Sequence, residues 1–213
     1  ELDVREACKL FIDNDIKTIA VSFIWSVLNP SHEIRAAQII KELMPDSIIT
    51  IGSELYPQIR EYTRTSTAIT NAYLSPILRN YVSTVNEYFI SLGGVNNVRY
   101  FQSNGGLATG KVMSDRSVYA INSGPASAPQ AGLAVCKPFD YKNVITVDMG
   151  GTSFDITLTK DGNTNLNKNI DFLRYRIGIP MIQVETLGAG GGSIVWIDEM
   201  GLLQVGPQSA GAD

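Results

Sequence analysis

The prediction of the fold depends on residues 144–162, VITVDMGGTSFDITLTKDG. From Phe154 to Thr159 apolar and polar residues alternate, which is the period of two that a half-buried strand shows. A second β-type run, 144–149, precedes the adjacent glycines Gly150 and Gly151. Glycine pairs are typical of turns. The stretch therefore predicts a β-hairpin with a glycine turn.

The turn of this hairpin has the residue types of a phosphate site. Glycines let backbone N–H groups approach phosphoryl oxygens without a Cβ in the way. Carboxylates beside a phosphate hold Mg²⁺, directly or through water, or orient an attacking water, and Asp148 and Asp155 lie near the two ends of the turn. An ordinary surface hairpin is the alternative. The candidate phosphate-binding residues are Gly150, Gly151, Thr152 and Ser153.

The composition indicates a globular protein without a nucleic-acid or membrane partner. Of 213 residues, 44% are hydrophobic and 18% charged, which is enough to build a sizeable core. The net charge of −4 leaves no basic stripe for nucleic acid or an anionic membrane. The only cysteines, Cys8 and Cys136, form no CxxC pattern, which favours a reducing compartment. No apolar run reaches the length of a membrane span, so we expect a cytoplasmic protein.

The first part of the chain, residues 1–120, shows the pattern of an α/β region. Helices are predicted over 3–14 and from Pro30 to Met44, and strands over 16–25 and 47–51. This order favours a mixed or parallel sheet with helices on its faces.

A long helix is predicted over Arg60–Phe89, with a bend at Pro76. Its apolar residues recur at spacings of three and four, beginning with Ile69 and Tyr73, and this stripe is predicted to face the core.

The second part, residues 121–213, contains the hairpin, a helix of small residues and a glycine-rich loop. A helix of small residues is predicted over 122–135, and Pro129 indicates that it begins late or bends. Before it, the loop QSNGGLATG places Asn104, Gly105 and Gly106 after a predicted strand, 97–101, where ligand crevices form.

A glycine-rich loop, Gly188–Gly192, lies near the end of the chain. Its backbone is unencumbered, and the apolar run Ile194–Ile197 is predicted to form a helix whose N-terminus faces an anion. A flexible connector is the equal alternative. The loop fits neither the dinucleotide fingerprint nor the P-loop. Its candidate cofactor-binding residues are Gly190, Gly191, Gly192 and Ser193.

Taken together, these segments resemble the hydantoinase A and oxoprolinase family. The resemblance covers nearly the whole chain, and a helix of small residues precedes the phosphate hairpin as in actin-like ATPases. The matching blocks are NPSHE (29–33), PQIREYTRTSTAITNAYLSPIL (57–78), QSNGG (102–106), SGP (123–125), DMGGTSFD (148–155), LGAGGGSI (187–194) and VGPQSAGAD (205–213).

The resemblance implies an actin-like ATPase (ribonuclease H-like) fold and a subunit that uses ATP and Mg²⁺. Members activate the carbonyl of a cyclic amide by phosphoryl transfer and work with a B-type partner subunit in a hetero-oligomer. Asp148 and Asp155 would then be the catalytic and metal-binding residues, and Asn104, Gly105 and Gly106 would contact substrate. The family also has an upstream DxGGTFTD hairpin, so we expect this chain to be an inactive excerpt.

Two other functions remain open. Acetone and acetophenone carboxylases of the same family use ATP to activate a ketone and bicarbonate, and the segments SGPASAP and YRIGIPMIQVETLG keep that branch open. A chaperone or filament protein of the actin type would use the nucleotide only as a conformational switch. Substrate-dependent release of ADP separates the two enzymes, and nucleotide-dependent peptide binding or polymerisation without turnover of a small molecule would indicate the chaperone or filament protein.

Overall fold

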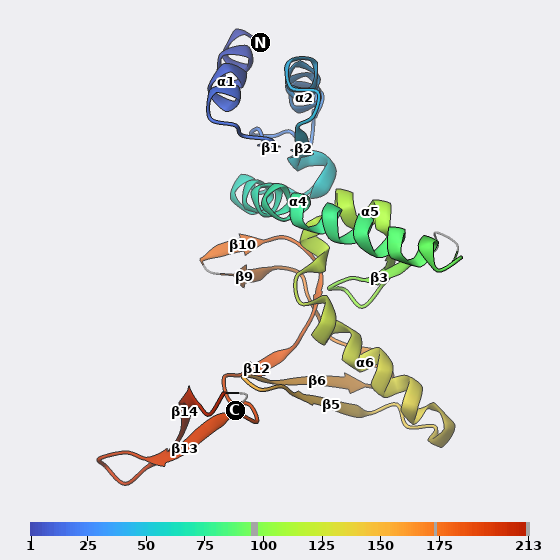
Figure 1. Cartoon of the computed structure of the whole chain (residues 1–213), viewed down its shortest axis with the longest axis vertical. Helices are drawn as coiled ribbons and strands as arrows, with labels where there is room; N and C mark the ends of the chain where they lie inside the picture. The colour runs from blue at the N-terminus through green and yellow to red at the C-terminus, as the bar shows by residue number, and fades with distance from the viewer. Residues whose placement is uncertain (95–97, 173, 212–213) are drawn as a thin grey trace. The chain divides into compact units, whose positions relative to one another are not determined.

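The computed structural model describes residues 1–94, 98–172 and 174–211 (Figure 1). Helices alternate with small sheets, which confirms the predicted α/β class. No helix among these residues has the length and apolarity that crossing a bilayer requires. The chain divides into two compact units: Glu1–Gln102, Gly106–Ile121 and Asn167–Met181 form the first, and Ser103–Gly105, Asn122–Leu166 and Ile182–Asp213 form the second.

The first unit begins with the predicted alternation of helices and strands. Its elements here are α1 (Leu2–Asp13), β1 (Thr18–Val21), α2 (Ser31–Leu43) and β2 (Ile48–Ile51). The two strands are parallel, with Thr18 opposite Ile48, as a connection through a helix requires. Cys8 of α1 and Ile40 of α2 join Ile19 in a buried apolar cluster. Cys8 is therefore a packing residue.

Helix α4 (Glu61–Ser91) contains Pro76 as predicted, but the prediction that its apolar stripe faces the core is wrong. Ile69, Tyr73, Ile77 and Tyr81 are exposed, Tyr73 to 74%. The spacing showed correctly that these residues share a face of the helix. It could not show which face the rest of the unit covers.

The buried face of α4 carries small and polar side chains instead, including Thr67, Ala68, Asn71, Ala72 and Ser75. Small side chains let a helix approach its neighbours closely, and the side chains of Thr67, Asn71 and Ser75 all make hydrogen bonds. Asn71 Nδ2 donates to Thr50 Oγ1 of β2 at 3.0 Å, and Asn71 Oδ1 accepts from the Val118 N–H at 3.0 Å. Asn71 thus links α4 to β2 and to the segment after α5.

Two antiparallel hairpins and several short helices complete the first unit. One hairpin pairs β3 with β4, and the other pairs β9 with β10. A second buried cluster gathers Leu55, Val118, Ile177, Ile179 and Met181. The bounds are α3 (Gly52–Leu55), β3 (Arg99–Phe101), β4 (Leu107–Thr109), α5 (Gly110–Asp115), η1 (Ser117–Ala120), β9 (Ile170–Phe172) and β10 (Tyr175–Ile177).

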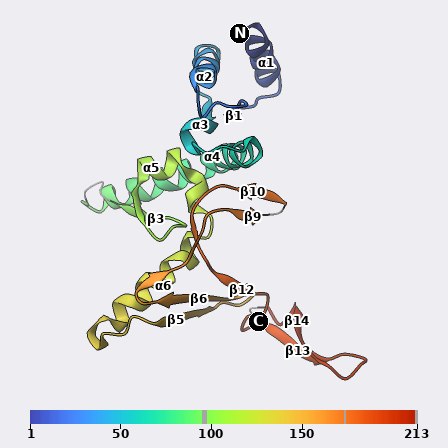
Figure 2. The ribbon, with the colours of Figure 1, turned by 180° about the vertical axis from the view of Figure 1, so that it is seen from behind.

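In the second unit, helix α6 (Ser123–Cys136) lies along the hairpin of β5 (Val144–Met149) and β6 (Phe154–Lys160) in both ribbon views (Figures 1 and 2). Gly132 of α6 faces Val144 and Thr146, and a Cβ there would meet both side chains. The helix begins at Ser123 and includes the buried Pro129, so the predicted late start is wrong. Its small residues serve this close packing.

The β5–β6 hairpin has the predicted alternation, but the polar face is the buried one. Thr157 and Thr159 are only 3% and 4% exposed, whereas Leu158 is 60% exposed and Val147 also 60%. The strand pattern gave two faces, and the position of α6 decided which of them is covered. The apolar face is left open in this chain.

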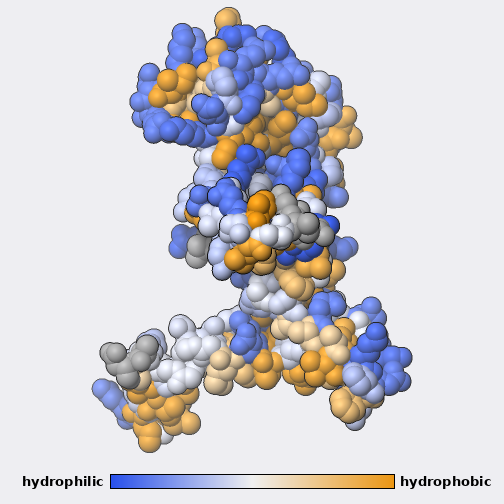
Figure 3. Space-filling model, turned by 45° about the vertical axis from the view of Figure 1, so that its right-hand side comes forward, coloured by the Kyte–Doolittle hydropathy of each residue, from blue (hydrophilic) through white to orange (hydrophobic). Residues whose placement is uncertain are grey.

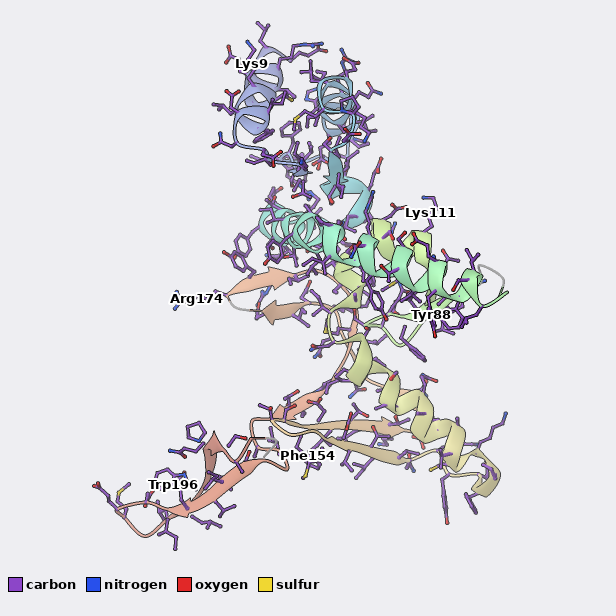
Figure 4. All side chains as sticks on the ribbon, viewed as in Figure 1. Lys9, Tyr88, Lys111, Phe154, Arg174 and Trp196 are labelled. Carbon is purple, nitrogen blue, oxygen red and sulfur yellow. The ribbon has the colours of Figure 1, made fainter. Side chains whose placement is uncertain are left out.

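The hairpin of β13 (Ser193–Ile197) and β14 (Leu203–Ser209) corrects the predicted helix over Ile194–Ile197. β-Branched and aromatic residues fit a strand better than a helix, and Val195 pairs with Val205. Trp196, labelled in Figure 4, donates its Nε1–H to the Gly206 carbonyl at 2.7 Å. Ile197 and Leu203 are exposed, and hydrophobic surface is visible at the lower end of Figure 3.

The remaining elements of the chain are short. They are η2 (Lys137–Phe139), β7 (Asn163–Thr164), β8 (Leu166–Asn167), β11 (Met181–Ile182) and β12 (Glu185–Leu187). Strand β12 adds to β6, which gives a sheet in the order β12-β6-β5. Residue 97 of the predicted strand 97–101 and residues 212–213 of the matching block VGPQSAGAD lie outside the described residues, as does residue 173.

Candidate functional site

The two aspartates of the hairpin face each other. Asp148 of β5 lies directly opposite Asp155 of β6 in the antiparallel register. Residues in such a pair lie on the same face, with Cβ atoms about 4.5–5.5 Å apart, and like charges at this distance repel each other. A bound cation would remove this repulsion. The pair is therefore a candidate cation site at the base of the glycine turn.

Strand β12 adds a third polar side chain to this row. Thr186 lies opposite Asp155, and its Oγ1 donates to Asp155 Oδ1 at 2.6 Å. The Asp148 carboxylate accepts no hydrogen bond from the described residues, so it is free for a ligand. Thr186 was missed from the sequence because nothing in its neighbourhood marks it; only the pairing of β12 with β6 places it here.

The turn itself presents unused N–H groups. The Gly150 N–H donates to the Ser153 carbonyl at 2.9 Å, which closes the base of the turn. Within the described part of the chain, the N–H groups of Gly151 and Thr152 donate to no acceptor. Both residues are exposed. Successive free N–H groups in a turn form a concavity that binds anions such as phosphate.

The glycine-rich loop lies directly against this turn, although it is distant in sequence. The Gly191 N–H donates to the Gly150 carbonyl at 2.9 Å, and the Gly192 N–H donates to the Gly151 carbonyl at 3.0 Å. The structure thus brings together two of the segments that the sequence singled out separately. Phe154, labelled in Figure 4, marks the point where the turn enters β6.

The N–H groups of Gly190, Gly191, Gly192 and Ser193 are all engaged within the protein. Gly190 donates to Ser193 Oγ at 2.9 Å, and Ser193 donates back to the Gly190 carbonyl at 3.0 Å. Because Gly191 and Gly192 donate to the turn, these four residues offer their backbone to the protein itself. That they contact nucleotide stays a prediction.

The third predicted segment, Asn104 to Gly106, belongs to the connection between the antiparallel strands β3 and β4. Gly105 has a φ of +80°, and a Cβ there would lie 3.1 Å from Ile182 Cδ1. The Ser103 carbonyl accepts from the Ile182 N–H at 2.8 Å. Gly105 therefore has a structural reason to be glycine, and the substrate role of the segment stays a prediction.

The carboxylate pair fits Mg²⁺ that arrives with a nucleotide. Such an ion takes one or two carboxylates, and waters and phosphate oxygens complete its octahedral shell. Asp148 and Asp155 supply these two carboxylates beside free turn N–H groups. In the described ranges no group of three or more His, Cys, Asp or Glu side chains is placed to hold a metal ion.

A glycine turn between two facing aspartates, with a small-residue helix packed on the hairpin, is the arrangement that the resemblance to actin-like ATPases implies. The family model described as "Hydantoinase/oxoprolinase" matches residues 64–213, and the model of the "Hydantoinase/oxoprolinase N-terminal region" matches residues 1–44. The chain belongs to the hydantoinase/oxoprolinase family.

Three relatives show how far this similarity extends. The chain is 60% identical, over its whole length, to caprolactamase subunit alpha of Pseudomonas jessenii. The crystal structure of the ATP-dependent caprolactamase from that organism matches 98% of the chain with a TM-score of 0.87 and 61% identity. A nucleotide-free acetone carboxylase structure matches 97% with a TM-score of 0.79 and 27% identity. The 5-oxoprolinase of Saccharomyces cerevisiae is 32% identical over the whole chain.

The chain is much shorter than these relatives. It spans 31% of caprolactamase subunit alpha, 30% of each of the two matching structural chains and 16% of the yeast 5-oxoprolinase.

Proposed function

We propose that this chain is part of the ATP-hydrolysing subunit of a cyclic-amide hydrolase, and that its substrate is a lactam of the caprolactam type. The observation that carries the proposal is the row of Asp148, Asp155 and Thr186 beside the unused N–H groups of the glycine turn. The 60% identity to a caprolactamase subunit supports the lactam over other cyclic amides.

The reaction needs ATP because an unstrained cyclic amide resists water. Resonance makes its carbonyl carbon a poor electrophile, and transfer of the γ-phosphoryl group to the amide oxygen supplies a leaving group. Water then adds to the carbon, the C–N bond breaks, and a further water releases phosphate. The products are a linear amino acid, ADP and phosphate. Catalysis of the transfer depends on positioning the phosphoryl group and stabilising its charge.

The residues of the hairpin have distinct parts in this proposal. The free N–H groups of Gly151 and Thr152 bind phosphoryl oxygens, with the hydroxyls of Thr152 and Ser153 beside them. Asp148 and Asp155 hold Mg²⁺, which neutralises phosphate charge when it is bound. Thr186 keeps the Asp155 carboxylate in a fixed orientation through its hydrogen bond.

A second polypeptide belongs to the proposed enzyme. The caprolactamase relative is named as subunit alpha, which supports a hetero-oligomer for the full-length protein. We propose a B-type subunit as the partner.

The proposal is tested by ADP release from the full-length protein with its partner subunit. We expect caprolactam to stimulate ADP release and to yield 6-aminohexanoate, with hydantoin and 5-oxoproline as weaker substrates. ADP release that requires acetone and bicarbonate instead would show a ketone carboxylase, the second candidate, which the match to acetone carboxylase supports. No turnover of ATP with any of these compounds would overturn the proposal.

Thr186→Val is expected to lower kcat about 10- to 100-fold, because a hydrogen bond to a charged group contributes about 1.5–3 kcal/mol. Thr186→Ser keeps the hydroxyl and is expected to stay within about threefold of wild type, since only a methyl group is lost. Steady-state assays of ADP release measure both variants. Equal rates for Thr186→Val and wild type would remove Thr186 from the site.

A further inference from the structure

The contact between the glycine-rich loop and the phosphate turn is made backbone to backbone. A Cβ at position 190 would lie 2.6 Å from the Gly150 carbonyl oxygen, the Gly151 carbonyl carbon and the Thr152 nitrogen. Real Cβ atoms do not approach other atoms so closely, and no flexible side chain is present that could move away. Alanine at 190 must therefore displace either the loop or the turn.

The neighbouring glycines differ in this respect. A Cβ at position 192 would lie 2.9 Å from Ser209 Oγ and 3.1 Å from the Gly151 carbonyl oxygen, whereas a Cβ at Gly188 would meet nothing within 4 Å. The requirement for glycine is thus greatest where the loop contacts the turn. A flexible connector would not show this dependence on position.

The loop is itself fixed on its other side. The Gly190 N–H and the Ser193 side chain are joined at 2.9 Å, and the Ala210 N–H donates to the Gly192 carbonyl at 2.7 Å. Residues 190–193 therefore form a turn that is hydrogen-bonded within itself and to residue 210, directly after β14. A neighbour held in this way can keep the phosphate turn in one conformation.

The hydrogen bonds from the loop also occupy the carbonyl groups of the phosphate turn. The Gly150 carbonyl accepts from Gly191, and the Gly151 carbonyl accepts from Gly192. With both carbonyls drawn to the loop, the N–H groups of Gly151 and Thr152 remain without acceptors in the described part of the chain. The carbonyl oxygens of Gly150 and Gly151 are thus occupied by the loop, whereas the N–H groups of Gly151 and Thr152 stay available to bind phosphate.

We propose that the loop Gly190–Ser193 is a brace that holds the Gly150–Ser153 turn open for phosphate, with Gly190 as the main positioning residue. This inference rests on the proposed function, because it assigns the loop's effect to nucleotide binding. It gives the glycine-rich motif a supporting role through the turn. Direct contact of Gly190 with nucleotide is not required.

The test uses the full-length protein with its partner subunit and compares Gly190→Ala with the matched control Gly188→Ala. We expect Gly190→Ala to raise the KM for ATP at least about tenfold, because small displacements of binding groups are costly. The KM for the lactam should not change. Simple loss of folded enzyme would lower kcat and leave the KM for ATP as it is. Gly188→Ala is expected to match wild type.

A milder variant and a direct measurement guard against misfolding of Gly190→Ala. Ser193→Ala removes the acceptor of the Gly190 N–H and is expected to raise the KM for ATP about threefold, as loss of one neutral hydrogen bond does. Hydrogen exchange should show slow exchange of the Gly191 and Gly192 amides in wild type and in Gly188→Ala. Both amides should exchange faster in Gly190→Ala.

The outcomes separate the two proposals. If wild type uses ATP and neither Gly190→Ala nor Ser193→Ala changes the KM for ATP, the brace is overturned and the proposed function stands. Fast exchange of the Gly191 and Gly192 amides in wild type would also overturn the brace. If wild type neither binds nor hydrolyses ATP, both proposals fall.

Discussion

Asp148→Asn is expected to lower kcat for ATP-dependent turnover by about 10²- to 10³-fold. Removal of one group that stabilises transition-state charge has an effect of this size. The substitution keeps the shape of the side chain and removes its charge, so Mg²⁺ loses a ligand and the phosphoryl group loses its neutralising ion. Asp155 supplies only the second carboxylate of the pair, so it cannot replace the charge that Asp148 loses.

The same substitution should not weaken the fold. Two carboxylates face each other across β5 and β6, and like charges in this position are destabilising. Removing one of them is expected to leave the melting temperature equal to or above that of wild type. Turnover should therefore fall while the melting temperature does not, as expected for a residue whose role is functional.

The measurement is ADP release and thermal unfolding of the full-length protein with its partner. Asp161→Asn is the matched control, because Asp161 is exposed and lies at the other end of the same hairpin. We expect this control to keep wild-type turnover. Turnover of Asp148→Asn within about twofold of wild type would contradict the assigned role, given the size of charge effects in such sites.

Glu33→Ala is expected to destabilise the first unit by about 3 kcal/mol, since it leaves a buried donor, the Ser53 N–H, and a partly buried donor, the Phe23 N–H, without acceptors. The Glu33 side chain is fully buried near the start of α2. Its Oε1 accepts from the Phe23 N–H at 2.7 Å, and its Oε2 accepts from the Ser53 N–H at 2.9 Å. These N–H groups follow β1 and β2, so one carboxylate fixes the segments that leave both parallel strands.

Amide hydrogen exchange at Phe23 and Ser53 in the full-length protein measures this effect locally. Glu42→Gln is the matched control on the same helix. Its ion pairs with Arg5 and Arg35 are exposed, so we expect a change within about 0.5 kcal/mol. If Glu33→Ala leaves the exchange rates of the Phe23 and Ser53 amides unaltered, the structural role of Glu33 is refuted.

The contribution of Glu33 should also depend on pH. Burial raises the pKa of Glu33, but hydrogen bonds from Ser53 and Phe23 outweigh it and hold the pKa below the usual value. A lowered pKa stabilises the folded state above the unfolded pKa of about 4.3, and this contribution is lost as the pH falls through the folded pKa. The stability difference between wild type and Glu33→Gln should be constant at neutral pH and shrink on acidification.

The local patterns of the sequence predicted the long helices α1, α2, α4 and α6 and the β5–β6 hairpin, because such patterns depend on neighbouring residues. The period of two gave β5 and β6, Pro30 and the helical spacing gave α2, and Pro76 did not stop α4 from being recognised. The prediction failed at Ile194–Ile197, where a run of apolar residues has no period. Spacing alone does not separate a short helix from a strand in such a run, and the pairing with β14 settled it.

Which face of an element is buried could not be predicted from spacing. The stripe of α4 and the apolar face of β5–β6 were both found with correct membership, and both are exposed. Burial depends on what packs on an element: α6 covers the threonine face of the hairpin, and polar residues of α4 meet β2. These neighbours are distant in sequence and leave no local signal.

By itself the sequence determined the hairpin, its glycine turn and the two aspartates, because turn chemistry and strand alternation act over a few residues. Only the tertiary structure decided that Asp148, Asp155 and Thr186 form one row and that the glycine-rich loop rests on the turn. Strand register and backbone packing join residues far apart along the chain. No short stretch of residues encodes these contacts, because they form only when the sheet is assembled.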